Sequence, residues 1–308
     1  MEFNEFAEKV RSSAQEILGD DFYVELKEII KINGIRMTNV TIYNKNTSVA
    51  PSIYLEDFYE QYVSGKSFDG VMNKIMKVYW EYKPEENLDL SYINEYELVK
   101  SKLVISLVNH EKNIEFTKDC PTIPFLDLDI IFNIELNNSL GNGLIKITDK
   151  MMATWEINSQ TLLEDAMFFT MHNHKEKCFT MFEYFISAPA GKELISCEEL
   201  DYRSYEFLKQ TWIVTNEDGY RGAAVMLYEG MMSKFADVFE SSYYIIPSSI
   251  HELILIPDKE CASYDCLPDL ECIKSMVKMV NSTEVSPNEV LSDNVYYFDR
   301  YEGKVLLA

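Results

Sequence analysis

The hydrophobic positions at the start of the chain recur at the spacing of an amphipathic helix. Within residues 2–18, the apolar side chains that share one helical face are Phe3, Phe6, Val10, Ala14 and Ile17. Gly19 follows this segment, and glycine commonly ends helices because it adopts left-handed backbone angles without strain. The pattern therefore predicts a first helix that ends near residue 18.

Two strand-like segments, 22–31 and 35–43, follow the helix and are joined by Asn33-Gly34. Asn-Gly between two such segments is the strongest short signal for a β-hairpin, because both residues accept positive φ angles. A further short strand is expected around Ile53, before a helix.

Capping residues mark the starts of three more helices. Ser67 precedes a broad apolar helical face, and Thr148 precedes a short helix. Thr161 and Glu164 have the spacing of a capping box at the start of a longer helix that runs to about Asn173.

Paired apolar runs dominate the second half of the chain. They are FLDLDIIFNIEL with LIKI, TWIVT with GAAVMLY, YYIIP with HELILIP, and a final hairpin in NVYYFDRYEGKVLLA. We expect GAAVMLY to be a buried strand, and near-continuous apolar strands such as YYIIP to be buried on both faces. A helix at 230–240 is expected to turn five side chains inward: Met231, Met232, Phe235, Val238 and Phe239.

The order strand, turn, strand, helix recurs at 35–63, 128–155 and 211–239. The pattern predicts an α+β fold with mixed or antiparallel sheets and packed helices, built from recurring ββα-like units. The proline-containing stretch TKDCPTIP is the best candidate for a domain boundary. We therefore expect domains at 1–118 and 119–308, or one continuous domain.

The composition argues against disorder, nucleic-acid binding and membrane association. The 308 residues carry a formal charge of −23, and 47% are hydrophobic, which is enough for a packed core. An excess of carboxylates argues against direct binding to nucleic acid or to an anionic membrane. No apolar run is long enough to span a bilayer, and the first residues lack the basic region of a signal peptide. We expect a cytoplasmic protein.

Nucleotide-binding loops, metalloprotease motifs, EF-hand loops and serine-hydrolase elbows do not occur in the sequence, so no cofactor is expected. The six cysteines are expected to be reduced thiols, and their spacing does not predict a zinc site. His172 and His174 bracket the predicted end of a helix, where the helix dipole favours imidazolium without any ligand.

The segment from Pro247 to Glu252 places two hydroxyls, an imidazole and a carboxylate close together in the chain. A hydrolase would use Ser248 or Ser249 as nucleophile and His251 as base, with Glu252 nearby. Members of such a site normally come from separate segments. The alternative is a tight turn in which the serine hydroxyls bond the local backbone.

Acidic pairs offer a third chemistry. Asp127 with Asp129, and Asp20 with Asp21, could bind a divalent ion in a metal-dependent nuclease. Alternating aspartates on a strand more often form its solvent face. The sequence supplies no histidine or third carboxylate in a recognisable metal motif beside them, and no metal site is assigned.

Several blocks of the chain resemble a family of uncharacterised proteins. These are NGIRMTNVTIYNKNTSVAPSIYLEDFYEQYVSGKSF, LIKITDKMMATWEINSQTLLEDA, GAAVMLYEGMMSKFADVFESSYYIIPSSIHELILIPD and NSTEVSPNEVLSDNVYYFD. The family is a domain-of-unknown-function group from gut anaerobic Gram-positive bacteria, and the resemblance implies a cytoplasmic protein without assigning an activity. The motif-like positions that match are Pro247, Ser248, Ser249, His251, Glu252, Ser292 and Asp293.

The expected function is non-enzymatic binding of a protein partner. Tyrosine provides large amphipathic contacts at protein interfaces, and many tyrosines occur here, although some are expected in the core. They include Tyr54, Tyr59, Tyr62, Tyr243, Tyr244, Tyr296 and Tyr297. One version is an inhibitor or regulator in conflict between phage or mobile elements and their host, acting on a partner with a basic groove.

Overall fold

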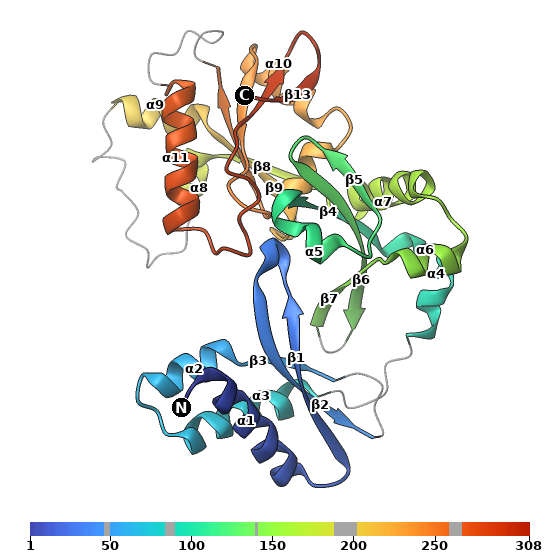
Figure 1. The fold of residues 1–308 in the computed structure, drawn as a ribbon. Coiled ribbons are helices and arrows are strands. Elements are labelled where there is room, and N and C mark those ends of the chain that lie inside the picture. The colour runs from blue at the N-terminus through green and yellow to red at the C-terminus, as the bar shows by residue number, and fades with distance from the viewer. Residues whose placement is uncertain (46–49, 84–89, 139–140, 188–201, 259–266) are drawn as a thin grey trace. The chain divides into compact units, whose positions relative to one another are not determined.

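The computed structural model describes residues 1–45, 50–83, 90–138, 141–187, 202–258 and 267–308. It is an α+β fold with antiparallel sheets and packed helices, as predicted (Figure 1). Two compact units divide the chain: residues 1–95 with 136–143, and residues 96–135 with 144–308. Among the described helices, none is both long and apolar enough to cross a membrane.

The first unit combines a three-stranded sheet with three helices. The sheet has the order β1-β2-β3. The elements are α1 (Phe3–Leu18), β1 (Phe22–Ile30), the 3-10 turn η1 (Ile32–Gly34), β2 (Arg36–Asn44), β3 (Ser52–Tyr54), α2 (Glu56–Val63), α3 (Phe68–Tyr82) and the 3-10 turn η2 (Ser91–Asn94).

The predicted hairpin is confirmed. Nine residue pairs join β1 to β2, from Phe22 opposite Asn44 to Ile30 opposite Arg36. Asn33 has a φ of 63°, in the left-handed region that asparagine tolerates better than most residues.

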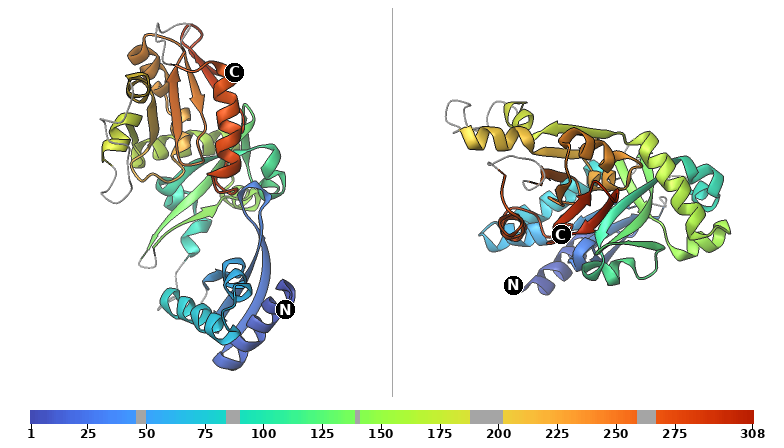
Figure 2. Two further views of the ribbon diagram at one scale, coloured as in Figure 1. Left: turned by 90° about the vertical axis from the view of Figure 1, so that its left-hand side faces the viewer. Right: turned by 90° about the horizontal axis from the view of Figure 1, so that it is seen from above.

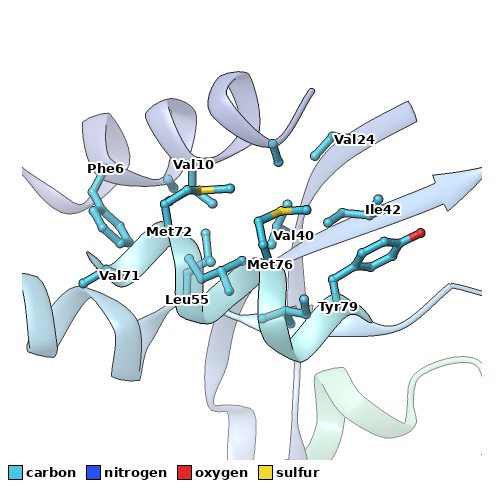
Figure 3. Close-up of a cluster of buried hydrophobic side chains, with 14 residues drawn as sticks. Phe6, Val10, Val24, Val40, Ile42, Leu55, Val71, Met72, Met76 and Tyr79 are labelled. Carbon is cyan, nitrogen blue, oxygen red and sulfur yellow. The ribbon is translucent and has the colours of Figure 1, made fainter. Parts of the chain in front are cut away.

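The core of this unit lies between the helices and one face of the sheet (Figure 3). The buried residues of α1 recur every three or four positions, and those of α3 form a second stripe. Ser67 caps α3 by accepting a hydrogen bond from the N–H of Gly70, as predicted. The fully buried members include Phe6, Val10, Val40, Leu55, Val71 and Ile75.

The second unit contains two sheets. The smaller has the strand order β4-β6-β5, with β7 also paired to β6. Its elements are α4 (Tyr96–Val99), η3 (Lys100–Lys102), β4 (Leu103–Asn109), η4 (Glu111–Asn113), α5 (Ile114–Thr117), β5 (Thr122–Phe125), β6 (Leu128–Asn138), β7 (Gly141–Lys146), α6 (Asp149–Trp155) and α7 (Ser159–Asn173).

Strand β4 lies at the edge of this sheet, and helix α7 covers that edge. The N–H of Ile105, on β4, donates to Oγ1 of Thr170 at 3.0 Å, and Nδ2 of Asn173 donates to the carbonyl of Ser101. The expected boundary between residues 118 and 119 lies within this unit, and β4 and β6, on either side of it, pair along seven residues.

The larger sheet has six strands in the order β13-β12-β10-β11-β9-β8. Its elements are β8 (Glu176–Thr180), α8 (Met181–Ser187), α9 (Tyr202–Gln210), β9 (Trp212–Asn216), η5 (Gly222–Leu227), α10 (Met231–Phe239), β10 (Tyr243–Ile246), β11 (Leu253–Pro257), α11 (Leu270–Thr283), β12 (Tyr296–Asp299) and β13 (Lys304–Leu307).

Strand β10 is buried on both faces, as its continuous apolar sequence predicts. Tyr243 packs against Phe235 and Phe239 of α10. On the opposite face, Ile246 packs in a cluster with Ile273 of α11, which lies along the sheet (Figure 2). Tyr243 and Tyr296 are therefore core residues and not recognition residues.

The expectation of a strand in GAAVMLY was wrong. Residues Gly222–Leu227 form the 3-10 helix η5, so the third predicted ββα unit lacks its second strand. The reason lies in tertiary packing: Gly222 is pressed against β9 and the backbone of His251, with no room for a side chain. Val238 was also misplaced, because its side chain is 61% exposed.

The start of α7 differs from the predicted capping box. Asn158 is the cap, and its Oδ1 accepts from the N–H of Thr161 at 2.9 Å. The predicted cap Thr148 is confirmed for α6, where its Oγ1 accepts from the N–H of Met151.

Candidate functional site

The loop from Pro247 to Glu252 connects β10 to β11 and is a tight turn. Oγ of Ser249 accepts from the N–H of His251 at 3.0 Å, and Oγ of Ser248 lies 3.5 Å from Oε1 of Glu252. Both hydroxyls therefore act within the turn, as serines in turns commonly do.

The imidazole of His251 is held by two other segments. Its Nδ1 accepts from the backbone N–H of Arg221 at 3.0 Å, and its Nε2 lies 3.7 Å from Oε1 of Glu289. A neutral imidazole has one donor and one acceptor nitrogen, and Nδ1 is already the acceptor. Neither of these two ring contacts involves Ser248 or Ser249, the predicted nucleophiles.

Arg221 connects this loop to the smaller sheet of the second unit. Its Nη1 donates to Oγ of Ser106 on β4 at 3.1 Å, and Asn133 on β6 donates to the same hydroxyl. Nε of Arg221 is buried without a hydrogen-bond partner. The residue has a φ of 54°, a left-handed conformation that is uncommon for a bulky side chain.

Asp127 and Asp129 do not form the solvent face that alternating acids predict. The carboxylate of Asp127 accepts three hydrogen bonds from the C-terminal segment: from Ser292 at 2.6 Å, Asn294 at 3.0 Å and Tyr296 at 2.7 Å. Burial raises the pKa of the Tyr296 hydroxyl, so it remains a proton donor in this cluster.

Asp129 is paired with His110, a residue that the sequence did not single out. Nδ1 of His110 lies 2.8 Å from Oδ2 of Asp129; the imidazole is 56% exposed, whereas the aspartate side chain is 4% exposed. Oδ1 of Asp129 is buried without a partner. His110 directly follows β4, and no pattern in the sequence around it predicted the pair.

Ser292 and Asp293, two of the motif-like positions, belong to the C-terminal segment that is hydrogen-bonded to Asp127. Asp293 accepts from Nδ2 of Asn281 at 2.9 Å and from Nζ of Lys112 at 3.1 Å. Burial alone would raise the pKa of the Asp293 carboxyl, but these two donors outweigh it and hold the pKa below its ordinary value.

His174 is more constrained than a histidine that only compensates a helix dipole. Its Nδ1 lies 2.6 Å from Asp218 and its Nε2 lies 3.5 Å from Glu135. The hydroxyl of Tyr228 donates to its carbonyl at 2.8 Å. His172, by contrast, stacks on Phe168 at the surface of α7.

A separate group of side chains lies at the C-terminal end of α3 in the first unit. The ring centroids of Phe22 and Trp80 are 6.4 Å apart, and Nζ of Lys83 lies 4.7 Å from the centroid of Trp80. Trp80 is 47% exposed and Tyr82 is 54% exposed. Tyr82 follows Trp80 by two residues in α3 and therefore points to another side of the helix. We call Phe22 and Trp80 the Trp80 patch.

The sequence between residues 3 and 300 matches the family of unknown function DUF5688. The chain belongs to the DUF5688 family. The match covers nearly the whole chain, as the resemblance of separate blocks led us to expect. Neither the curated proteins nor the solved structures contain a match to this DUF5688 chain.

In the described part of this DUF5688 chain, no three His, Cys, Asp or Glu side chains are grouped suitably for an ion. Cys120, Cys178 and Cys272 are free thiols, and burial raises the pKa of Cys178 to about 11. The other three cysteines, Cys197, Cys261 and Cys266, lie outside the described residues.

Proposed function

We propose that this DUF5688 chain is a non-enzymatic protein-binding protein that engages its partner through the Trp80 patch. The observation that carries the proposal is the exposure of Trp80 near the end of α3, where its ring lies beside the half-buried Phe22. Tryptophan and tyrosine are enriched where alanine substitution costs most binding energy at protein interfaces.

The physical basis is the apolar area that these rings leave in water. Full burial of a large apolar side chain contributes roughly 1.5–3 kcal/mol. Covering the exposed part of Trp80, about half of the residue, therefore contributes roughly 1–1.5 kcal/mol, and few rotatable bonds are frozen in doing so. The ring of Trp80 is already held by Phe22 and Tyr79, so less conformational entropy is lost when a partner covers it.

The hydrolase alternative centred on Pro247–Glu252 is less well supported. The acceptor nitrogen of His251 is bonded to Arg221, and the hydroxyl of Ser249 accepts from the backbone within the turn. A base must be able to take the proton of its nucleophile, and neither serine is hydrogen-bonded to the ring. A nuclease would need metal ligands, and the described residues do not group three such side chains together.

The test is affinity capture from a native lysate with three forms of the full chain. Wild type is compared with Trp80→Ala and with Phe168→Ala, a control that removes a more exposed aromatic side chain from α7. We expect one partner to be recovered by wild type and by the control and to be lost with Trp80→Ala. Equal recovery by all three forms would overturn the proposal.

The setting of this proposal follows from the family resemblance. We place the protein in the cytoplasm of a gut anaerobic bacterium, as an inhibitor or regulator in conflict between phage or mobile elements and their host. The partner recovered by affinity capture would identify the biological process. A secreted or envelope-bound partner would contradict the cytoplasmic setting.

A further inference from the structure

Arg221 differs from the other three arginines whose side chains the structure describes, because it has no acidic partner. The other three form ion pairs with carboxylates: Arg11 with Glu8, Arg36 with Glu28, and Arg300 with Asp237. No residue in the described part of the chain forms an ion pair with Arg221. The chain has 51 acidic residues and 28 lysines and arginines, so carboxylates are not scarce. The missing counter-charge is therefore a property of this site.

The guanidinium of Arg221 is held in place by its neighbours. Its Nη1 donates to Oγ of Ser106 at 3.1 Å, and Nδ2 of Asn133 donates to the same oxygen. Ser106 and Asn133 are 1% and 2% exposed, so this anchor is buried. In addition, Cζ of Arg221 lies 5.7 Å from the centroid of the Tyr220 ring. A side chain that is fixed in this way loses little conformational entropy when it binds a ligand.

The edge of the guanidinium formed by Nε and Nη2 has no acceptor. Nε is buried without a partner. Nη2 makes no hydrogen bond to any residue that the structure describes, and solvent reaches it. The hydroxyl of Ser106 accepts two hydrogen bonds and, within the same described residues, donates none. Three donor groups around one positive charge therefore lack an acceptor.

The backbone of Arg221 is strained in a way that is common at ligand sites. Its φ of 54° lies in the left-handed region, which costs a bulky residue free energy. The N–H of Arg221 donates to Nδ1 of His251 at 3.0 Å and helps to hold this conformation. Strained residues that their surroundings hold in place cluster at sites that bind ligands.

We propose that the Nε–Nη2 edge of Arg221 binds a small oxyanion, either a carboxylate or a phosphate group. The two parallel N–H groups of this edge match two oxygens of such an anion in a bidentate contact. A buried water would satisfy Nε but would leave the charge uncompensated. Nη2 receives the first oxygen from solvent, and the contact with Nε forms when the ring of Tyr220, which is 53% exposed, moves aside. Arg221 belongs to the second unit and the Trp80 patch to the first, so this site goes beyond the proposed function.

The test is an NMR titration of the full chain, labelled with ¹⁵N at the arginine Nε atoms. The chain has five arginines, so the spectrum is simple. Sodium phosphate and sodium acetate are titrated separately, and sodium chloride keeps the ionic strength constant. Arg221→Lys assigns the Arg221 signal. If this variant does not fold, lysine substitutions at the other four arginines assign the signal by elimination.

We expect the Arg221 signal alone to shift and to saturate, with a dissociation constant on the order of 1–10 mM for the tighter anion. The tighter anion identifies the ligand as a phosphate or a carboxylate. Ser106→Ala, which removes the acceptor of Nη1, should weaken binding about threefold or more, whereas the buried control Ser242→Ala should change it less than about twofold. A shift without saturation, equal shifts of all five signals, or equal weakening by the two serine variants would overturn the inference.

Discussion

The backbone N–H of Arg221 donates a hydrogen bond to Nδ1 of His251, and the two nitrogens are 3.0 Å apart. Nδ1 is thereby the acceptor nitrogen, so a neutral ring carries its proton on Nε2, which faces Glu289. In this state the ring has no acceptor left for the proton of Ser248 or Ser249.

Ser249→Ala is expected to lower the free energy of unfolding by about 1 kcal/mol, because Oγ of Ser249 accepts from the N–H of His251. Ser248→Ala is the control and is expected to cost less than about 0.5 kcal/mol, since its hydroxyl makes only a long contact with Glu252. Urea denaturation measures both. A chromogenic ester assay should give equal rates for both variants and His251→Ala, and loss of a wild-type rate would favour the hydrolase alternative.

Gly222→Ala is expected to destabilise the second unit by about 3 kcal/mol or more, as overpacking of a rigid site does. An added Cβ would lie 2.6 Å from both the Asn216 nitrogen and the His251 carbonyl oxygen, and would collide with Oγ1 of Thr215. Gly143→Ala meets only an ordinary contact at 3.9 Å and should change the free energy of unfolding by less than about 1 kcal/mol. Thermal unfolding of the two variants compares them; similar midpoints would contradict the packing account.

Tyr296→Phe is expected to cost about 1–3 kcal/mol, because it removes a buried donor to the Asp127 carboxylate. Ser292→Ala removes another donor to the same group. Since both share one acceptor, their effects should be non-additive by at least about 0.5 kcal/mol in a double-mutant cycle. Strict additivity would show that the two hydroxyls do not act through Asp127.

His110→Ala should destabilise the protein by about 2 kcal/mol, because it leaves the buried Asp129 carboxylate without its partner. Adding Asp129→Leu should recover part of that loss by removing the buried charge. His172→Ala is the control, since its exposed ring only stacks on Phe168, and should stay within about 0.5 kcal/mol. A double variant less stable than His110→Ala alone would refute this account of the pair.

Asp293 predicts a specific dependence of stability on pH. Its folded-state pKa is held below the ordinary value, so the stabilisation is present above the unfolded-state pKa of about 4. It is lost as pH falls through the folded-state pKa. The stability difference between wild type and Asp293→Asn, followed by urea denaturation from pH 7 to pH 2, should therefore shrink in acid. Glu60→Gln, at an exposed acid without an ion pair, should show no such change.

Local signals predicted much of the fold because they act within a few residues. Asn33-Gly34 sets a hairpin, and Ser67 and Thr148 cap helices through bonds to backbone groups three residues away. The prediction failed for Gly222–Leu227, whose small apolar residues have the composition of a buried strand. Gly222 contacts β9 and the backbone of His251, which lie outside the segment, so the composition of the segment alone does not predict its conformation.

The candidate functional residues also fall into two groups: those that are close together in the sequence, and partners that only the fold brings to them. The cluster around Ser248, Ser249 and His251 was visible in the chain, but its hydrogen-bond partner Arg221 was not. His110 and Asp129 are 19 residues apart and meet because β4 and β6 pair. Trp80 and Phe22 meet because α3 packs on the sheet that begins with β1.

The sequence by itself determined the α+β class, the hairpin of β1 and β2, the starts of α3 and α6 and the acidic charge, because periodicity, capping and composition are properties of short segments. Only the tertiary structure decided which polar groups are paired and which aromatic rings are exposed. Hydrogen-bond partners and burial depend on segments brought together from far apart in the chain. That is why Tyr243 and Tyr296 lie in the core, whereas Trp80 and Tyr82 remain at the surface.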